Sequence, residues 1–253
     1  MIPDQQFLSQ EQVATTVLTL SDDDQAKILN GKIIPGDRVF YPVKSHIRAS
    51  VPKSEKNNLD GKGALIQGGR DAGRYQRLLD MLGQNVHQVV EQGKHPDLCI
   101  YLTGNVPDFS KLTELSRSEW DELVNQFINQ PAVFTQRYIN EFVPGGSDDP
   151  RKFKDAKGRI IIIGPALPAG KKISGHERAK VEVFRGALRP FATTINQELS
   201  DVLKSNIRVF LILPGTVDGK EPSNENIVNT INYLMSDEAA SSSEVIFCPD
   251  ETR

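Results

Sequence analysis

The sequence predicts a three-layer α/β fold, in which helices cover both faces of a doubly wound parallel sheet. Five short apolar runs each end in Gly or Pro, which is typical of strands buried on both faces of a parallel sheet. These runs are 63–69, 98–104, 159–165, 207–215 and 243–249. Helical patterns separate them, so strand and helix alternate along the chain. Alternation of this kind predicts right-handed crossovers between parallel strands.

The first 60 residues are organised differently from the rest. Residues 10–24 have a helical pattern and residues 30–43 have the pattern of an extended strand. A helix at 224–240 followed by the run at 243–249 repeats this order at the end of the chain. The two helices match at Val13, Thr16, Val17 and Leu20 against Ile227, Thr230, Ile231 and Leu234.

This repeat predicts three segments. They are an N-terminal helix and strand at 1–50, a polar linker at 51–62 and an α/β domain at 63–253. The N-terminal strand carries Ile33, Ile34, Val39 and Phe40. An unpaired strand of this composition is prone to aggregate, so we expect it to join a sheet of this chain or of a partner.

Three further segments have the apolar period of amphipathic helices. They are 70–92, 117–143 and 176–204, and the second is expected to begin with Ser118 as its N-terminal cap. Pro131 and Pro190 are expected to kink the two long helices without ending them. The apolar stripes are Leu78, Leu82, Val86 and Val89 or Val90; Leu123, Phe127, Phe134, Tyr138 and Phe142; and Val183, Ala187, Phe191, Ile195 and Leu199.

Composition excludes several classes of protein. The chain has 253 residues and a formal net charge of −3, so it lacks the basic surplus of a nucleic-acid-binding protein. No apolar run is long enough to span a membrane, and no secretory leader precedes the domain. Cys99 and Cys248 lie in apolar runs and predict buried thiols, not a disulfide or a metal site. We expect a cytoplasmic protein without a metal ion.

The motifs resemble, in their order, those of the short-chain dehydrogenase/reductase (SDR) family over residues 60–253. "PDLCIYLTG" (96–104) stands where the family has a strand ending in Asn-Asn-Ala-Gly. "HERAK" (176–180) stands for Tyr-x-x-x-Lys, and "IRVFLILPG" (207–215) is similar to the Ile-Arg-Val…Pro-Gly strand. The resemblance implies a Rossmann-like fold of the SDR type. It also implies that the N-terminal helix and strand are the tail of an upstream SDR domain.

The resemblance assigns a remnant of the catalytic site to His176 and Lys180. In the family the tyrosine donates a proton, the lysine lowers its pKa, a serine orients the carbonyl group and an asparagine completes the relay. Here His176 replaces the tyrosine, Gly164 or Pro165 stands at the serine position, and Phe127 stands at the asparagine position. Only the lysine is retained, which predicts that the family's chemistry has been lost.

The cofactor site implied by the resemblance is reduced in the same way. Gly68, Gly69 and Gly73 are the candidate cofactor-binding residues of the run "QGGRDAGRY" (67–75), but Arg74 stands where a closing glycine is expected. These glycines equally fit a tight strand-to-helix turn without a ligand. No second or third strand is visible between the predicted helix and residue 98, so we predict a sheet lacking both strands and expect no cofactor.

The sequence therefore predicts a non-catalytic, SDR-like scaffold or oligomerisation domain. The order of its parts resembles the C-terminal region of multidomain malonyl-CoA reductases, so the expected partners are a second copy or an upstream catalytic reductase domain. Two alternatives stay open. One is an active NADP-dependent reductase that uses His176 and Lys180, and the other is a small-molecule sensor on an inactive reductase fold.

Overall fold

The structure is a computed structural model. It describes residues 47–48, 56–68, 78, 80–84, 88–89, 96–107, 112–143, 149–167, 175–215, 223–242 and 245–247. The chain divides into two units, Met1–Ser45 and His46–Arg253, and every described residue belongs to the second unit. The predicted N-terminal helix and the strand expected to join a sheet lie outside the described residues.

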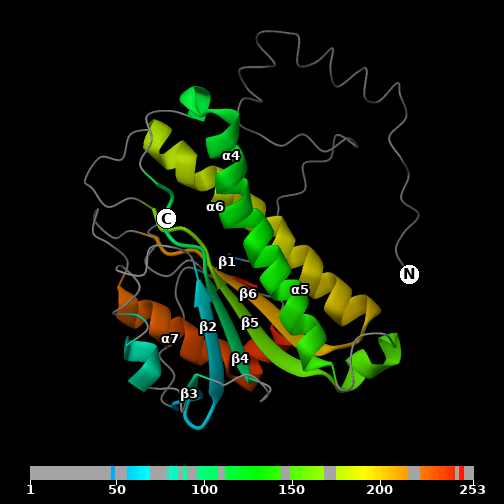
Figure 1. Cartoon of the computed structure of the whole chain (residues 1–253). Coiled ribbons are helices and arrows are strands. Elements are labelled where there is room, and N and C mark those ends of the chain that lie inside the picture. The colour runs from blue at the N-terminus through cyan, green and yellow to red at the C-terminus, as the bar shows by residue number, and fades with distance from the viewer. Residues whose placement is uncertain are drawn as a thin grey trace, which may run out of the picture. The chain divides into compact units, whose positions relative to one another are not determined.

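The described residues form one parallel sheet of seven strands in the order β1-β7-β6-β5-β4-β2-β3 (Figure 1). The central strands β4, β5 and β6 pair over their full lengths and are almost completely buried. This confirms the doubly wound parallel sheet. The strands are β1 (Ile47–Arg48), β2 (Gly63–Gly68), β3 (Gln88–Val89), β4 (Leu98–Leu102), β5 (Lys157–Ile163), β6 (Asn206–Ile212) and β7 (Ile246–Phe247).

The outermost strands on both sides of the sheet differ from the prediction. A short second strand is present, because β3 pairs parallel with β2 on the side away from β4. The helix expected over 70–92 therefore ends before Gln88. Gly83 weakens the helix there, whereas Val86, Val89 and Val90 favour extended backbone. On the other side of the sheet, β1 pairs with β7, and β1 was not predicted.

One long helical run covers the sheet after β4. It consists of α4 (Arg117–Val124), the π-helix η2 (Asn125–Asn129) and α5 (Gln130–Phe142). Its cap is Ser116 and not Ser118. The Ser116 hydroxyl accepts the Glu119 N–H at 3.3 Å, while the Glu119 carboxylate accepts the Ser116 N–H at 2.8 Å. The Ser116 hydroxyl also donates to the Glu119 carboxylate at 2.6 Å, and this bond, followed by that of the Ser116 N–H, holds the pKa of Glu119 below its usual value.

Neither proline ends its helix, as predicted. Pro131 lies just after the π turn. It has no N–H, so it cannot donate the α-helical hydrogen bond to the Phe127 carbonyl four residues back. The change of hydrogen-bond register therefore occurs where one α-helical bond is already missing. Pro190 lies inside α6 (Gly175–Gln197), which continues into a second π-helix, η4 (Glu198–Val202). This run ends at Lys204, whose φ is 54°. Other helices among the described residues are η1 (Leu112–Glu114), η3 (Pro150–Asp155), α7 (Asn224–Leu234) and α8 (Asp237–Ser241), and residues 80–84 are also helical.

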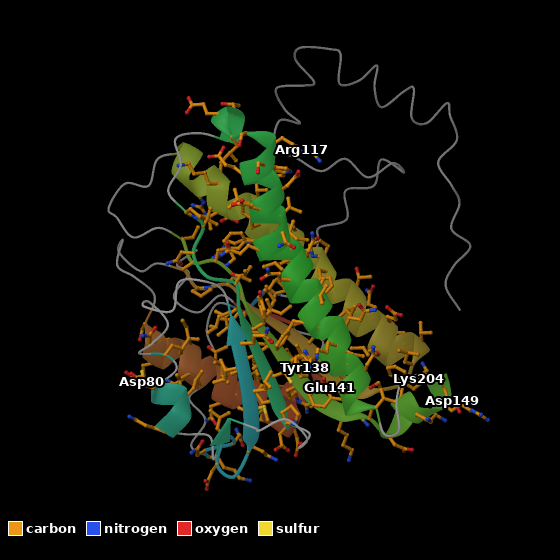
Figure 2. The ribbon with its side chains drawn as sticks, viewed as in Figure 1. Asp80, Arg117, Tyr138, Glu141, Asp149 and Lys204 are labelled. Carbon is orange, nitrogen blue, oxygen red and sulfur yellow. The ribbon has the colours of Figure 1, made fainter. Side chains whose placement is uncertain are left out.

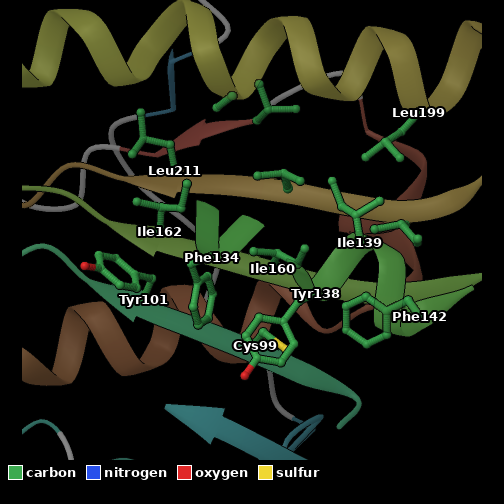
Figure 3. Close-up of a cluster of buried hydrophobic side chains, with 14 of the residues drawn as sticks. Cys99, Tyr101, Phe134, Tyr138, Ile139, Phe142, Ile160, Ile162, Leu199 and Leu211 are labelled. Atoms are coloured by element: carbon green, nitrogen blue, oxygen red, sulfur yellow. The ribbon is translucent and has the colours of Figure 1, made fainter. Parts of the chain in front are cut away.

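Two cores lie on opposite faces of the sheet. On one face α5 and α6 pack on β4, β5 and β6, in the cluster shown in Figure 3. Cys99 is buried in this cluster, as predicted, and burial raises the pKa of its thiol above the usual range. On the other face, α7 packs on the sheet through Ile227, Val228 and Ile231. None of the helices in the described part of the chain is both long and apolar enough to cross a membrane.

The placement of α7 fixes the hand of one connection. The chain steps from β4 to β5, β6 and β7 in one direction across the sheet. The helices of the first two steps cover one face, whereas α7, between β6 and β7, covers the other. The last connection must therefore have the opposite hand to the first two. Right-handed crossovers throughout, the expectation from sequence, cannot hold for all three.

Candidate functional site at the carboxyl edge

Ligands of doubly wound sheets bind where the carboxyl ends of the strands meet, so the candidate site is the edge formed by the ends of β2, β4, β5 and β6. The segment that follows β5, residues 164–167, is buried. Two backbone hydrogen bonds fasten it to β6 and its loop: Gly164 N–H to the Ile212 carbonyl at 2.8 Å, and Leu167 N–H to the Pro214 carbonyl at 3.3 Å. The ends of β5 and β6 are thus joined by the backbone itself.

Arg185 is the charged group of this edge. Its side chain is fully buried beneath the loops, although it comes from the middle of α6. Nη1 donates to the Pro165 carbonyl at 3.1 Å and to the Pro214 carbonyl at 2.8 Å. Pro165 and Pro214 lie just beyond the ends of β5 and β6, and a guanidinium group with five N–H donors can bind both carbonyls at once. Arg185 therefore acts as a clamp between the β5 and β6 loops.

The carboxylate of Glu182 lies close to three arginines along this stripe of α6. Glu182 lies 3.7 Å from Arg178, 3.7 Å from Nε of Arg185 and 3.6 Å from Arg189. Arg178 and Arg189 reach solvent, whereas Arg185 does not. The ion pair with Glu182 reduces the cost of burying the Arg185 charge.

The predicted catalytic pair is only partly described. Lys180 is 4% exposed on the inner side of α6. The backbone of His176 belongs to the first turn of the same helix, but its side chain lies outside the description. Whether the two side chains meet therefore stays a prediction. Arg185 was missed because the apolar stripe predicted for this helix was placed on Val183, Ala187 and Phe191. The buried face instead carries Val181, Leu188 and Ala192, and Arg185 lies on it.

The two other positions assigned by the resemblance are packed with apolar atoms. A β-carbon at Gly164 would lie 2.7 Å from Cδ2 of Leu213 and 3.2 Å from Cδ1 of Leu188, so a serine does not fit without movement of the core. Phe127 is fully buried in η2. Its ring centre lies 4.9 Å from that of Phe184, in a cluster that also holds Trp120. At the position of the family's asparagine, Phe127 thus joins η2 to α6 by aromatic packing.

Among the three candidate cofactor-binding glycines, Gly68 has a structural role. Gly68 ends β2 and is paired in register with Leu102 of β4. A β-carbon at Gly68 would lie 2.6 Å from Cβ and 2.8 Å from the carbonyl oxygen of Leu102, so glycine is required by the close approach of the strands. Gly69 and Gly73 lie outside the described residues.

The residues after β4 leave one polar atom unsatisfied. Gly104 has a φ of +83°, and Gln126 of η2 donates through Nε2 to the Thr103 carbonyl at 3.1 Å. Oδ1 of Asn105 is buried and accepts no hydrogen bond within the described part of the chain. A ligand donor would satisfy it. Gly164 and Phe127, at the serine and asparagine positions of the family, offer no side-chain hydrogen bond to a substrate carbonyl group.

Comparison with solved structures defines the fold of this chain. Similar structures include a short-chain dehydrogenase from Leptospira borgpetersenii with bound NAD+ (TM-score 0.57, 12% identity, 79% of this chain and 96% of that one). A short-chain dehydrogenase/reductase from Serratia marcescens is similar at TM-score 0.55 and 17% identity, over 76% of this chain and 97% of that one. A 4-hydroxyisoleucine dehydrogenase complexed with NADH is similar at TM-score 0.52 and 16% identity, over 74% and 96%.

These similarities confirm the predicted fold, a Rossmann-like α/β architecture of the short-chain dehydrogenase/reductase type. At such low identities they describe the fold alone. No protein-family model and no curated protein sequence matches the chain. The resemblance to multidomain malonyl-CoA reductases therefore stays a prediction from the order of motifs.

Proposed function

We propose that this chain is a non-catalytic SDR-like scaffold or oligomerisation domain, which works within a larger NADPH-dependent reductase assembly of the malonyl-CoA reductase kind. The observation that carries the proposal is the Arg185 clamp. Ligands of doubly wound sheets lie over the carboxyl ends of the strands, so this is the edge that a substrate and a cofactor would approach. Here a buried guanidinium group holds the carbonyls of Pro165 and Pro214 together.

The arrangement of apolar surface supports a role in assembly. The large hydrophobic side chains that are exposed within the described residues are Val133, Val183 and Val202, which are 64%, 38% and 69% exposed. All three belong to the helical runs α5 and α6–η4, which cover the same face of the sheet (Figure 1). A second copy of the chain, or an upstream catalytic domain, would remove these side chains from water.

Sedimentation of the chain with NADPH tests both parts of the proposal. Absorbance of the reduced nicotinamide reports whether the nucleotide travels with the protein, and the sedimentation rate reports self-association. We expect no saturable co-sedimentation at millimolar NADPH, and association that Val202→Glu weakens.

The rival reductase predicts the reverse. Saturable micromolar binding that is lost in Lys180→Ala would overturn the scaffold proposal and favour an enzyme that uses His176 and Lys180. A chain that stays monomeric, and does not associate with a catalytic reductase domain, would remove the assembly role.

A further inference from the structure

A cavity of ≈ 490 Å³ opens at the amino edge of the sheet, opposite the edge discussed so far. It lies among the starts of β4 and β5, the end of α5 and the start of α8, and Figure 2 shows Glu141 at this end of the molecule. Six of its lining residues are charged: Lys62, Asp97, Glu141, Lys157, Arg159 and Asp237. A volume of this size is in the usual range of small-molecule sites, about 300–1,000 Å³.

Two of the three carboxylates have cations of their own. Asp97 lies 3.7 Å from Nζ of Lys62 and accepts the Gly63 N–H at 3.0 Å. Glu141 accepts a hydrogen bond from Nε of Arg137 at 3.0 Å. Within the described residues these pairs leave Lys157 and Arg159, together with the neighbouring Arg208, opposite Asp237 alone. The lining itself is neutral, with three cations against three carboxylates, and the positive surplus comes from Arg137 and Arg208 behind it.

Arg159 is the centre of this surplus. Its Nη1 donates to the carbonyls of Gly158 and Asn206, at 3.0 and 3.1 Å, which fixes the plane of the guanidinium group. Nε is buried and has no hydrogen-bond partner in the part of the chain that the structure describes. Arg208 stands beside Arg159 in the register of β5 and β6. Burial, and then the charge of Arg208, lower the pKa of Arg159.

Arg159 is only partly buried, but even partial burial of a cation beside a second cation is unfavourable unless an anion accompanies it. Asp237 acts on Arg159 only as a weaker, opposing influence on its pKa. The Nε side of a guanidinium group is also half of the two-donor fork that binds carboxylate and phosphate. Charge, an unsatisfied donor and an open volume thus coincide at one place.

We propose that the amino-edge cavity binds the anionic group of a small molecule, a carboxylate or a phosphate, with Arg159 as its principal cation and Lys157 at its rim. The site does not depend on the scaffold function, because it lies at the other edge of the sheet from the Arg185 clamp. An anion held there would neutralise Arg159 and screen it from Arg208. It would also tie β5 and β6 to the amino-edge ends of α5 and α8.

Thermal unfolding of the full chain with inorganic phosphate or with succinate, each against sodium chloride at equal ionic strength, tests this site. We expect a saturable rise in melting temperature with at least one of the two anions. The anion that produces the rise shows whether the cavity binds a phosphate or a carboxylate group. Arg159→Met should weaken anion affinity about tenfold or more. Lys157→Gln, on an exposed residue, should weaken it severalfold.

Arg117→Gln is the matched control, because Arg117 is an exposed arginine that pairs with Asp121 at the far end of α4. It should leave the anion response unchanged. A purely structural Arg159 predicts altered stability but the same anion affinity, so an unaltered response in Arg159→Met overturns the proposal. So does a wild-type response no larger than that to chloride. If Arg159→Met does not fold, an unchanged affinity in Lys157→Gln has the same meaning.

Discussion

The two edges of the sheet hold arginines in different circumstances. At the carboxyl edge, the Arg185 side chain is fully buried, donates to two loop carbonyls and lies 3.7 Å from Glu182. At the amino edge, Arg159 is only partly buried, borders an open cavity and stands beside Arg208. The first arginine ties two loops of the protein together, whereas the second has open volume beside it.

This contrast separates fold from function. Doubly wound sheets usually bind ligands at the carboxyl edge, because loops diverge there and leave a crevice. In this chain Arg185 holds the segments after β5 and β6 together, and within the described residues an open charged space lies at the other edge. Similarity of fold alone does not locate a ligand site.

Arg185→Met gives the largest expected effect. The substitution removes the cation but keeps most of the volume, and it leaves the carbonyls of Pro165 and Pro214 without their donor. Loss of one partner from a buried ionic network costs about 3–5 kcal/mol, so urea unfolding should show a loss of that size. Arg117→Met, on an exposed arginine, should change stability by less than about 0.5 kcal/mol. Equal stability of the two variants would mean that the clamp does not hold the carboxyl edge together.

Gly68→Ala gives an intermediate effect. The added methyl group meets backbone atoms of Leu102, which cannot move as the end of a flexible side chain can. We expect a loss of about 1–3 kcal/mol in unfolding experiments without any nucleotide. Gly186→Ala is the control, since a β-carbon there has no neighbour within 4 Å, and it should stabilise α6 by up to about 1 kcal/mol. An unchanged stability in Gly68→Ala would return this glycine to the candidates for ligand binding.

Lys204→Gly gives the smallest effect and concerns the amino edge. Lys204 has a left-handed φ of 54°, and the Ser205 N–H reaches back to the Leu199 carbonyl at 2.8 Å to close the helix. Glycine adopts this conformation without strain, so the variant should gain about 1 kcal/mol, measured as a higher urea midpoint. Lys204→Ala removes the same side chain but keeps the β-carbon, and it should gain nothing. Equal gains would trace the effect to the lysine charge.

The fold was predictable where burial decides it. The strands β4, β5 and β6 consist of residues that are apolar on both faces, and short runs of this kind between turn residues are typical of central parallel strands. The two-residue strands β1 and β3 are too short to produce a pattern. The helix cap was also predictable, because Ser116 is followed three positions later by Glu119, the capping-box pair, whereas Ser118 is followed by Asp121.

The site was predictable only in part. The family pattern indicated which catalytic side chains had been replaced, and Gly164 and Phe127 prove to be packed against core residues. It gave no indication of Arg185, because a substituted position in a motif does not reveal what fills the vacated space. The surplus charge around Arg159 depends on pairing between residues far apart in the chain, such as Lys62 with Asp97, and no local pattern contains that information.

The two π turns affect how the chain tolerates changes in its length. A π turn contains one residue more than an α turn. The buried faces of the helix before and after the π turn therefore keep the alignment that they would have without the extra residue. Shortening residues 125–129 by one would restore plain α-helical bonding and leave Leu123 and Phe134 pointing as before. The same deletion inside α5 would turn every later residue by roughly 100° about the helix axis and expose the stripe that ends at Phe142. Length variation among relatives of this chain is therefore expected to gather at 125–129 and 198–202.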